Sequence, residues 1–179
     1  MISRSAAVLV VVDIQGNLYE AMQKKESLLT NTLKMVKGAQ AFNLPVIVTE
    51  QIPAKLGKTV PALAQELKGV EIISKESFSC WGENKFRERL ESFSRRKVIL
   101  LGIECHVCVY QTAMDLIDNG YSIHVVADAV SSRVKENSDC GLAAMKTAGA
   151  NLTSTEMILF ELLRTAGDAK FKDIYKIVK

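Results

Sequence analysis

The stretch Lys97-Val-Ile-Leu-Leu-Gly-Ile-Glu-Cys-His-Val-Cys-Val109 joins a continuous apolar run to a segment with helical character. Residues 98–101 have the unbroken hydrophobicity of a strand that is covered on both faces, and residues 111–117 are patterned like a helix. A strand that runs into a helix across a short turn is typical of a parallel βαβ unit. The stretch therefore predicts an α/β fold and places Cys108 near the start of a helix.

The same alternation of short apolar runs and longer helical patterns continues along the whole chain. We expect helices over 28–39, 83–93, 137–149 and 153–163. No linker or repeat interrupts the pattern, so residues 1–179 are predicted to form a single domain. The predicted fold is a three-layer α/β/α sandwich with a six-stranded, mainly parallel sheet of order 3-2-1-4-5-6. The expected strands are Ala6–Val12, Pro45–Thr49, Val70–Ser74, Lys97–Gly102, Ser122–Ala127 and Asn151–Thr153.

Composition argues against several classes of function. The 23 basic and 20 acidic residues are spread along the chain, so no basic face for nucleic acid is expected. The apolar run Val8–Val12 is too short to span a bilayer, and Asp13-Ile-Gln15 follows it where a signal peptide would carry a small-residue cleavage site. Four cysteines are too few for a dense disulfide framework in a chain of this length. We therefore expect free thiols, a cytoplasmic location and no membrane association.

Three reactive side chains follow three of the expected strands. Asp13 follows the first strand, Lys75 the third and Cys108 the fourth. Ligands of an open α/β sheet bind beyond the carboxyl ends of the strands, where the strand order reverses. A nearby ammonium, a carboxylate base and a helix N-terminus each favour the attacking thiolate of a cysteine. The pattern indicates nucleophilic catalysis, although taken singly an aspartate cap, a solvated lysine and a core cysteine fit equally well.

Cys105-His-Val-Cys108 also has the C-x-x-C spacing of a redox pair or of half a zinc site. Zinc would need two further ligands, and the other histidine, His124, lies inside an expected strand. Redox pairs usually follow the first strand of a thioredoxin-like unit, whereas this one follows the fourth. We expect no metal and no cofactor, while a disulfide between Cys105 and Cys108 could still inactivate the site.

Four segments together resemble the isochorismatase-like cysteine hydrolases, and the resemblance spans most of the chain. Val10-Val-Val-Asp-Ile-Gln15 and Ile72-Ile-Ser-Lys-Glu-Ser-Phe78 are similar to the family's aspartate and lysine segments. Gly102-Ile-Glu-Cys-His-Val-Cys-Val-Tyr-Gln-Thr-Ala113 is similar to its nucleophile motif, with Cys105 in place of the usual threonine. Val126-Ala-Asp-Ala-Val-Ser-Ser132 resembles the turn after its fifth strand.

The resemblance implies a role for each residue of the constellation. Asp13 would be the general base, Lys75 the stabilising cation and Cys108 the nucleophile. The backbone N–H groups of Glu104 and Cys108 would form the oxyanion hole, with a cis peptide bond at Ile103–Glu104. The implied activity is hydrolysis of a C–N bond in a small amide or carbamoyl compound by a homo-oligomer (dimer, tetramer or larger).

The surroundings of the site are expected to bind the substrate. Residues 52–61 contain two prolines and a glycine and should form a loop that borders the pocket. The chain lacks the histidine-containing metal set of nicotinamidases. Vinyl-ether hydrolysis of an isochorismate-like compound and a non-catalytic scaffold on the same fold remain alternatives, and residues 157–163 are a candidate subunit interface. Candidate pocket residues are Gln15, Tyr19, Glu50, Phe78, Trp81 and His106.

Overall fold

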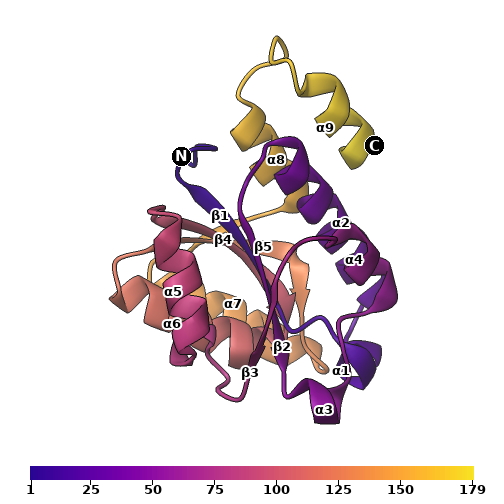
Figure 1. Ribbon diagram of the computed structural model, residues 1–179, viewed down its shortest axis with the longest axis vertical. Coiled ribbons are helices and arrows are strands. Elements are labelled where there is room, and N and C mark those ends of the chain that lie inside the picture. Colours follow the sequence, from indigo (N-terminus) through magenta and orange to yellow (C-terminus); the bar gives the residue numbers. More distant parts are fainter.

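The computed structural model describes residues 1–179 and forms one six-stranded sheet of order β3-β2-β1-β4-β5-β6 (Figure 1). Every neighbouring pair of strands is parallel, which confirms the predicted order and sharpens the expectation of a mainly parallel sheet. The strands are β1 (Ala7–Val12), β2 (Val46–Gln51), β3 (Ile72–Lys75), β4 (Lys97–Ile103), β5 (Ser122–Ser131) and β6 (Asn151–Thr153).

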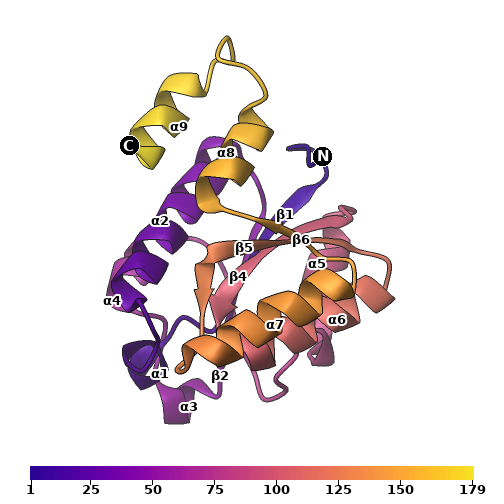
Figure 2. The same ribbon diagram turned by 180° about the vertical axis from the view of Figure 1, so that it is seen from behind.

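Helices cover both faces of the sheet because successive side chains of a strand point to opposite sides. In β1, Leu9 and Val11 join one hydrophobic core, whereas Val8, Val10 and Val12 join the other. The first core lies under α2 (Lys25–Ala41), α4 (Pro61–Glu66), α8 (Thr155–Leu163) and α9 (Phe171–Val178). The second lies under α5 (Asn84–Ser92), α6 (Tyr110–Asp118) and α7 (Lys135–Thr147), as Figure 2 shows from behind.

Several elements differ from the sequence-based expectation. The loop expected over 52–61 contains a short helix, α3 (Pro53–Leu56), and the first residue of α4; each of these helices begins at a proline, whose fixed φ suits a first turn. Helix α1 (Gly16–Glu20) and helix α9 were not expected. The expectation that residues 157–163 expose apolar side chains for a subunit interface is wrong. Of these apolar side chains only Met157 is largely exposed, whereas four are buried: Ile158, Leu159, Leu162 and Leu163.

The carboxyl ends of the strands meet at one edge of the sheet, next to α1 and α3 at the bottom of Figure 1. Strands β1 and β4 approach closely there, since a Cβ on Gly102 would lie 2.2 Å from the carbonyl oxygen of Val12. Gly102 also has φ +142°, a conformation that other residues rarely adopt. Position 102 therefore requires glycine.

None of the helices is both long and apolar enough to cross a membrane.

Candidate active site

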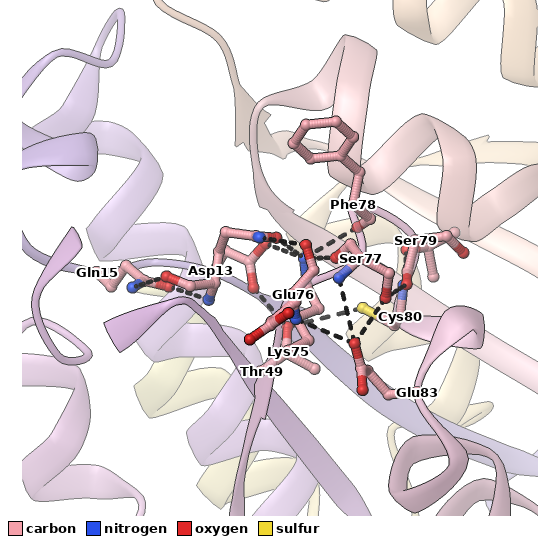
Figure 3. A network of polar contacts seen from close by, with 12 residues as sticks. Asp13, Gln15, Thr49, Lys75, Glu76, Ser77, Phe78, Ser79, Cys80 and Glu83 are labelled. Carbon is pink, nitrogen blue, oxygen red and sulfur yellow. Dashed lines mark hydrogen bonds and ion pairs between the residues drawn. The ribbon is translucent and has the colours of Figure 1, made fainter. Parts of the chain in front are cut away.

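An ion pair between Asp13 and Lys75 lies at the centre of the strand-end edge (Figure 3). Lys75 Nζ is 2.7 Å from Asp13 Oδ2, and both side chains are 0% exposed. Asp13 Oδ1 accepts a hydrogen bond of 2.7 Å from the hydroxyl of Thr49, at the end of β2. Strand order brings these residues together, because β1, β2 and β3 are neighbours that end at the same level.

The ammonium of Lys75 is also held by three uncharged oxygens. It donates to Gln51 Oε1 at 2.6 Å and to the carbonyl oxygens of Phe78 at 2.9 Å and Ser77 at 3.0 Å. Burial by itself lowers the pKa of Lys75, but the negative charge of Asp13 and the neighbouring sulfur atoms outweigh burial and raise that pKa above its ordinary value. Lys75 is therefore a fixed positive charge inside the protein.

Cys108 lies in a π-helical turn, Cys105–Val109, that leads directly into α6. The sequence had placed it near the start of a helix; the structure adds a wider turn there, a feature often found at functional sites. Gly141 of α7 packs against the turn: a Cβ at this position would lie 3.0 Å from the carbonyl oxygen of Cys105. Close helix packing thus fixes the backbone that carries Cys108.

The thiol of Cys108 is protonated in the resting structure. Burial is the main cause that raises the pKa of Cys108 to about 12; the charge of Asp13 adds to it and Lys75 opposes it. Cys108 is 4% exposed. A helix start and a nearby ammonium do not suffice to ionise this cysteine, because burial and the aspartate act in the opposite direction.

The other thiols occupy separate surroundings. Cys105 is fully buried, and its sulfur lies 3.7 Å from the carbonyl oxygen of Ser138 on α7. Cys80 is 3.7 Å from the Thr49 hydroxyl, and burial raises its pKa to about 11. All four cysteines are free, and no group of three or more His, Cys, Asp or Glu side chains could hold a metal ion. Cys105 and Cys108 are not bonded to each other.

Asp13 and Glu104 follow the adjacent strands β1 and β4 and share an uncommon backbone conformation. Their φ angles are +55° and +51°, in the left-handed region. Such strain in non-glycine residues concentrates at functional sites. All peptide bonds are trans, so the cis bond implied at Ile103–Glu104 is absent. The backbone N–H of Glu104 has no hydrogen-bond acceptor within the protein, which leaves it free to bind an oxyanion.

The side chain of Glu104 connects β4 to the segment after β5. Its Oε1 accepts a hydrogen bond from Arg133 Nε, and its Oε2 is buried without a hydrogen bond. His106 Nδ1 lies 2.9 Å from the hydroxyl of Ser132 and 3.4 Å from Glu104 Oε2. The side chains of His106 and Arg133 are 24% and 60% exposed. The β4–β5 side of the site is therefore polar and partly open.

Three predicted pocket residues form hydrogen bonds within the chain. Gln15 donates to the carbonyl oxygens of Gln51 and Gly57 and accepts from the Gln51 N–H. Glu50 Oε1 accepts from the N–H and hydroxyl of Thr59, at 2.6 and 2.7 Å. Tyr19 donates its hydroxyl to the carbonyl oxygen of Lys25. Gln15 and Glu50 hold the 52–60 segment over the strand ends, and Tyr19 holds the start of α2.

Phe78 and Trp81 lie on the segment that surrounds Lys75. The ring of Phe78 points away from the polar network in Figure 3, and the residue is 54% exposed. Trp81 packs edge-to-face on Tyr121, with ring centroids 5.8 Å apart.

A cavity of about 420 Å³ lies beside Lys75, between Ile52–Ala54 and Glu83. A cavity of similar size, about 450 Å³, lies between α2, β5 and α7 and is lined by none of the predicted residues.

Three residues that were not selected from the sequence also form hydrogen bonds with the candidate site residues. Thr49 and Gln51 contact the ion pair from the end of β2, and Arg133 binds Glu104 from the segment after β5. Polar residues at the end of an apolar strand were the available signal for Thr49 and Gln51. Nothing in the sequence around Arg133 indicates its partner, because Glu104 is 29 positions away.

Comparisons with known proteins agree with this fold. The family model described as the isochorismatase domain matches residues 7–157. The chain is 38% identical over 178 residues to the secreted isochorismatase effector Isc1 of Phytophthora sojae, covering 97% of this chain and 85% of that protein. The structure of a MAR1 ribonuclease from Caenorhabditis elegans superimposes with a TM-score of 0.94 at 35% identity, covering 99% and 91% of the two chains.

A more distant structure shares the fold. The YcaC gene product of Escherichia coli, described as an octameric hydrolase of unknown specificity, gives a TM-score of 0.93 at 23% identity, over 98% of this chain and 89% of that one. The sheet order and the buried aspartate, lysine and cysteine describe an α/β protein with a polar site at its strand ends. The chain belongs to the isochorismatase family of hydrolases.

Proposed function

We propose that the protein is a cysteine hydrolase that cleaves a C–N bond in a small amide or carbamoyl compound. The observation that carries the proposal is the buried ion pair of Asp13 and Lys75, which acts directly on the titration of Cys108. Burying an ion pair costs desolvation free energy, and buried charged groups with perturbed pKa values are concentrated at functional sites.

In the proposed reaction, Asp13 accepts the thiol proton as the sulfur of Cys108 attacks the substrate carbonyl carbon. The N–H groups of Glu104 and Cys108 hold the developing oxyanion. Asp13 then returns the proton to the leaving nitrogen, the C–N bond breaks, and a thioester remains. Asp13 next takes a proton from water, hydroxide adds to the thioester, and cleavage of the C–S bond releases the acid and restores the thiol.

Proton transfer and attack are coupled in this scheme because the resting thiol is not ionised. A thiol with a pKa of about 12 contributes almost no thiolate near neutral pH. Lys75 stabilises the negative charge as it forms on sulfur, and it does so without reorganisation because it is already held in place.

His106, Phe78 and Trp81 are the proposed substrate contacts, since they lie beside the site and are partly exposed. Gln15, Tyr19 and Glu50 support the pocket through the hydrogen bonds described above. We also propose a homo-oligomer, as in the octameric bacterial relative. The free cysteines support a reducing compartment such as the cytoplasm.

The test compares Cys108→Ala with Cys140→Ala, a control at an exposed cysteine on α7. Both variants and the parent protein are assayed by mass spectrometry against small amides, carbamoyl compounds, an isochorismate-type vinyl ether and a short RNA, included because one relative is described as a ribonuclease. We expect turnover of an amide or carbamoyl compound, reduced by at least about 10³-fold in Cys108→Ala and unchanged in Cys140→Ala.

Retained activity in Cys108→Ala would exclude the thiol mechanism. If that activity acted on the vinyl ether, it would favour the alternative chemistry, which needs no thiol. Failure of the parent protein to turn over any compound, together with failure of thiol reagents to label Cys108, would favour a non-catalytic role.

A further inference from the structure

The ammonium of Lys75 has more acceptors around it than protons to donate. Its three N–H groups face four oxygens: Gln51 Oε1 at 2.6 Å, Asp13 Oδ2 at 2.7 Å, and the carbonyl oxygens of Phe78 at 2.9 Å and Ser77 at 3.0 Å. Asp13 Oδ2 is paired with the ammonium by charge at this short distance, but it accepts no hydrogen bond. The three protons therefore go to the three uncharged oxygens.

This distribution leaves one oxygen of Asp13 without a hydrogen bond. Oδ1 accepts from Thr49, so Oδ2 is the oxygen that remains to receive a proton from the neighbouring thiol of Cys108. A buried carboxylate oxygen that accepts no hydrogen bond is a stronger proton acceptor than one that does, because a hydrogen bond to the ionised form stabilises it. The positive charge of Lys75 stays 2.7 Å from this oxygen.

The orientation of Gln51 is fixed by its own neighbours. Its side-chain nitrogen donates to the carbonyl oxygen of Glu76 at 2.8 Å, which turns the amide oxygen toward Lys75. Its backbone N–H donates to Gln15 Oε1 at 2.6 Å. Gln51 is 5% exposed. A rotation of the amide would direct its NH₂ group at the ammonium, so only one orientation is compatible with Lys75.

We propose that Gln51 is a positioning residue: its Oε1 takes the ammonium proton that would otherwise bind Asp13 Oδ2, and it thereby keeps Asp13 free to deprotonate Cys108. Lys75 then acts on the reaction through its charge and has no N–H left for the substrate. The proposal rests on the proposed function, because it concerns the base of that same reaction.

The test measures alkylation of Cys108 by acrylamide, which needs the thiolate but no turnover. The sulfur bonds to the β-carbon of the probe, and the thiol proton ends on the α-carbon. Rate constants at Cys108 are measured by peptide mass mapping between about pH 6 and pH 9. The variant Gln51→Met keeps the length of the side chain without its oxygen, whereas Gln51→Glu keeps an acceptor oxygen for Lys75.

We expect Gln51→Met to lower the rate constant at neutral pH by about tenfold or more, with a steeper rise toward high pH, because hydroxide must replace Asp13 as the base. Gln51→Glu keeps the acceptor for Lys75 but loses the donor to Glu76 and adds a negative charge, so its rate constant should lie between those of the parent protein and Gln51→Met. If Gln51→Met does not fold, Gln51→Asn carries the same expectation, because its oxygen is one methylene short of Nζ.

A parent-like rate and pH profile in Gln51→Met or Gln51→Asn would overturn the inference. So would a Gln51→Glu variant that is folded and as slow as Gln51→Met, because loss of the acceptor would then not be the cause. Failure of the proposed function has a different result: acrylamide would not label Cys108 in the parent protein in preference to the exposed Cys140.

Discussion

The two sides of the site differ in how completely they are closed. On the β1–β3 side, Asp13, Gln51 and Lys75 are each at most 5% exposed, and their polar groups are held by neighbours on three adjacent strands. On the β4–β5 side, His106 and Arg133 are partly exposed, and Glu104 keeps a buried oxygen without a hydrogen bond. Under the proposed function, the closed side would serve proton transfer and the open side substrate binding.

Removing the cation from the closed side should have the largest effect. Lys75→Met leaves Asp13 as an uncompensated buried charge, which typically costs about 3–5 kcal/mol of folding free energy. The same change should raise the pKa of Cys108 further, because Lys75 is the group that lowers it. We expect loss of acrylamide labelling at neutral pH and a strongly reduced urea midpoint.

The pH dependence of that stability difference follows from the direction of the shift. Folding raises the pKa of Lys75 above its ordinary 10.5, so its contribution is complete at neutral pH and is lost as pH rises through the folded-state value. The urea midpoints of the parent protein and Lys75→Met should therefore converge only at strongly alkaline pH. Equal midpoints at neutral pH would show that the closed side is not held by this ion pair.

A change on the open side should affect substrate binding more than the chemical step. Glu104→Gln removes the charge that binds Arg133 but leaves the backbone N–H of the proposed oxyanion hole in place. We expect KM to rise by about tenfold with kcat within about threefold, since the proposed substrate contact His106 lies 3.4 Å from Glu104 Oε2 and loses its charged neighbour. Arg133→Ala serves as the matched variant on the other partner.

The outcome of that experiment distinguishes the two sides directly. A large fall in kcat for Glu104→Gln with acrylamide labelling of Cys108 equally reduced would place Glu104 in the proton-transfer machinery. The contrast between a catalytic side and a binding side would then be wrong.

The smallest expected effect concerns a residue that was predicted to line the pocket. Tyr19→Phe removes the hydroxyl that donates to the carbonyl oxygen of Lys25 at 3.0 Å, and should cost about 1 kcal/mol of folding free energy. KM and kcat should not change if that hydrogen bond is the only role of the hydroxyl. Thermal unfolding and steady-state kinetics check both parts, and a rise in KM would return Tyr19 to the substrate contacts.

The sequence alone determined the α/β class and the six strands, because apolar runs of strand length alternate with helical patterns. The strand order was predicted as one of the few that a parallel sheet allows, and the structure confirmed it. Asp13, Lys75 and Cys108 could be selected for the same reason, since each follows a strand. The boundaries were less certain: β5 continues to Ser131, four residues beyond its predicted end at Ala127. Its last residues pair with β4 across an irregular register, which no local pattern encodes.

Only the tertiary structure decided how the polar groups share their hydrogen bonds. Gln51, Ser77 and Phe78 are distributed over β2 and the segment after β3, and their acceptors converge on one ammonium. Glu104 and Arg133 likewise meet because β4 and β5 are neighbours. Residue type and strand position follow from local sequence, whereas proton placement and burial depend on distances between segments far apart in the chain. For that reason Cys108 could be selected from the sequence as a candidate nucleophile, whereas its raised pKa and the contacts of Gln51 could not be predicted.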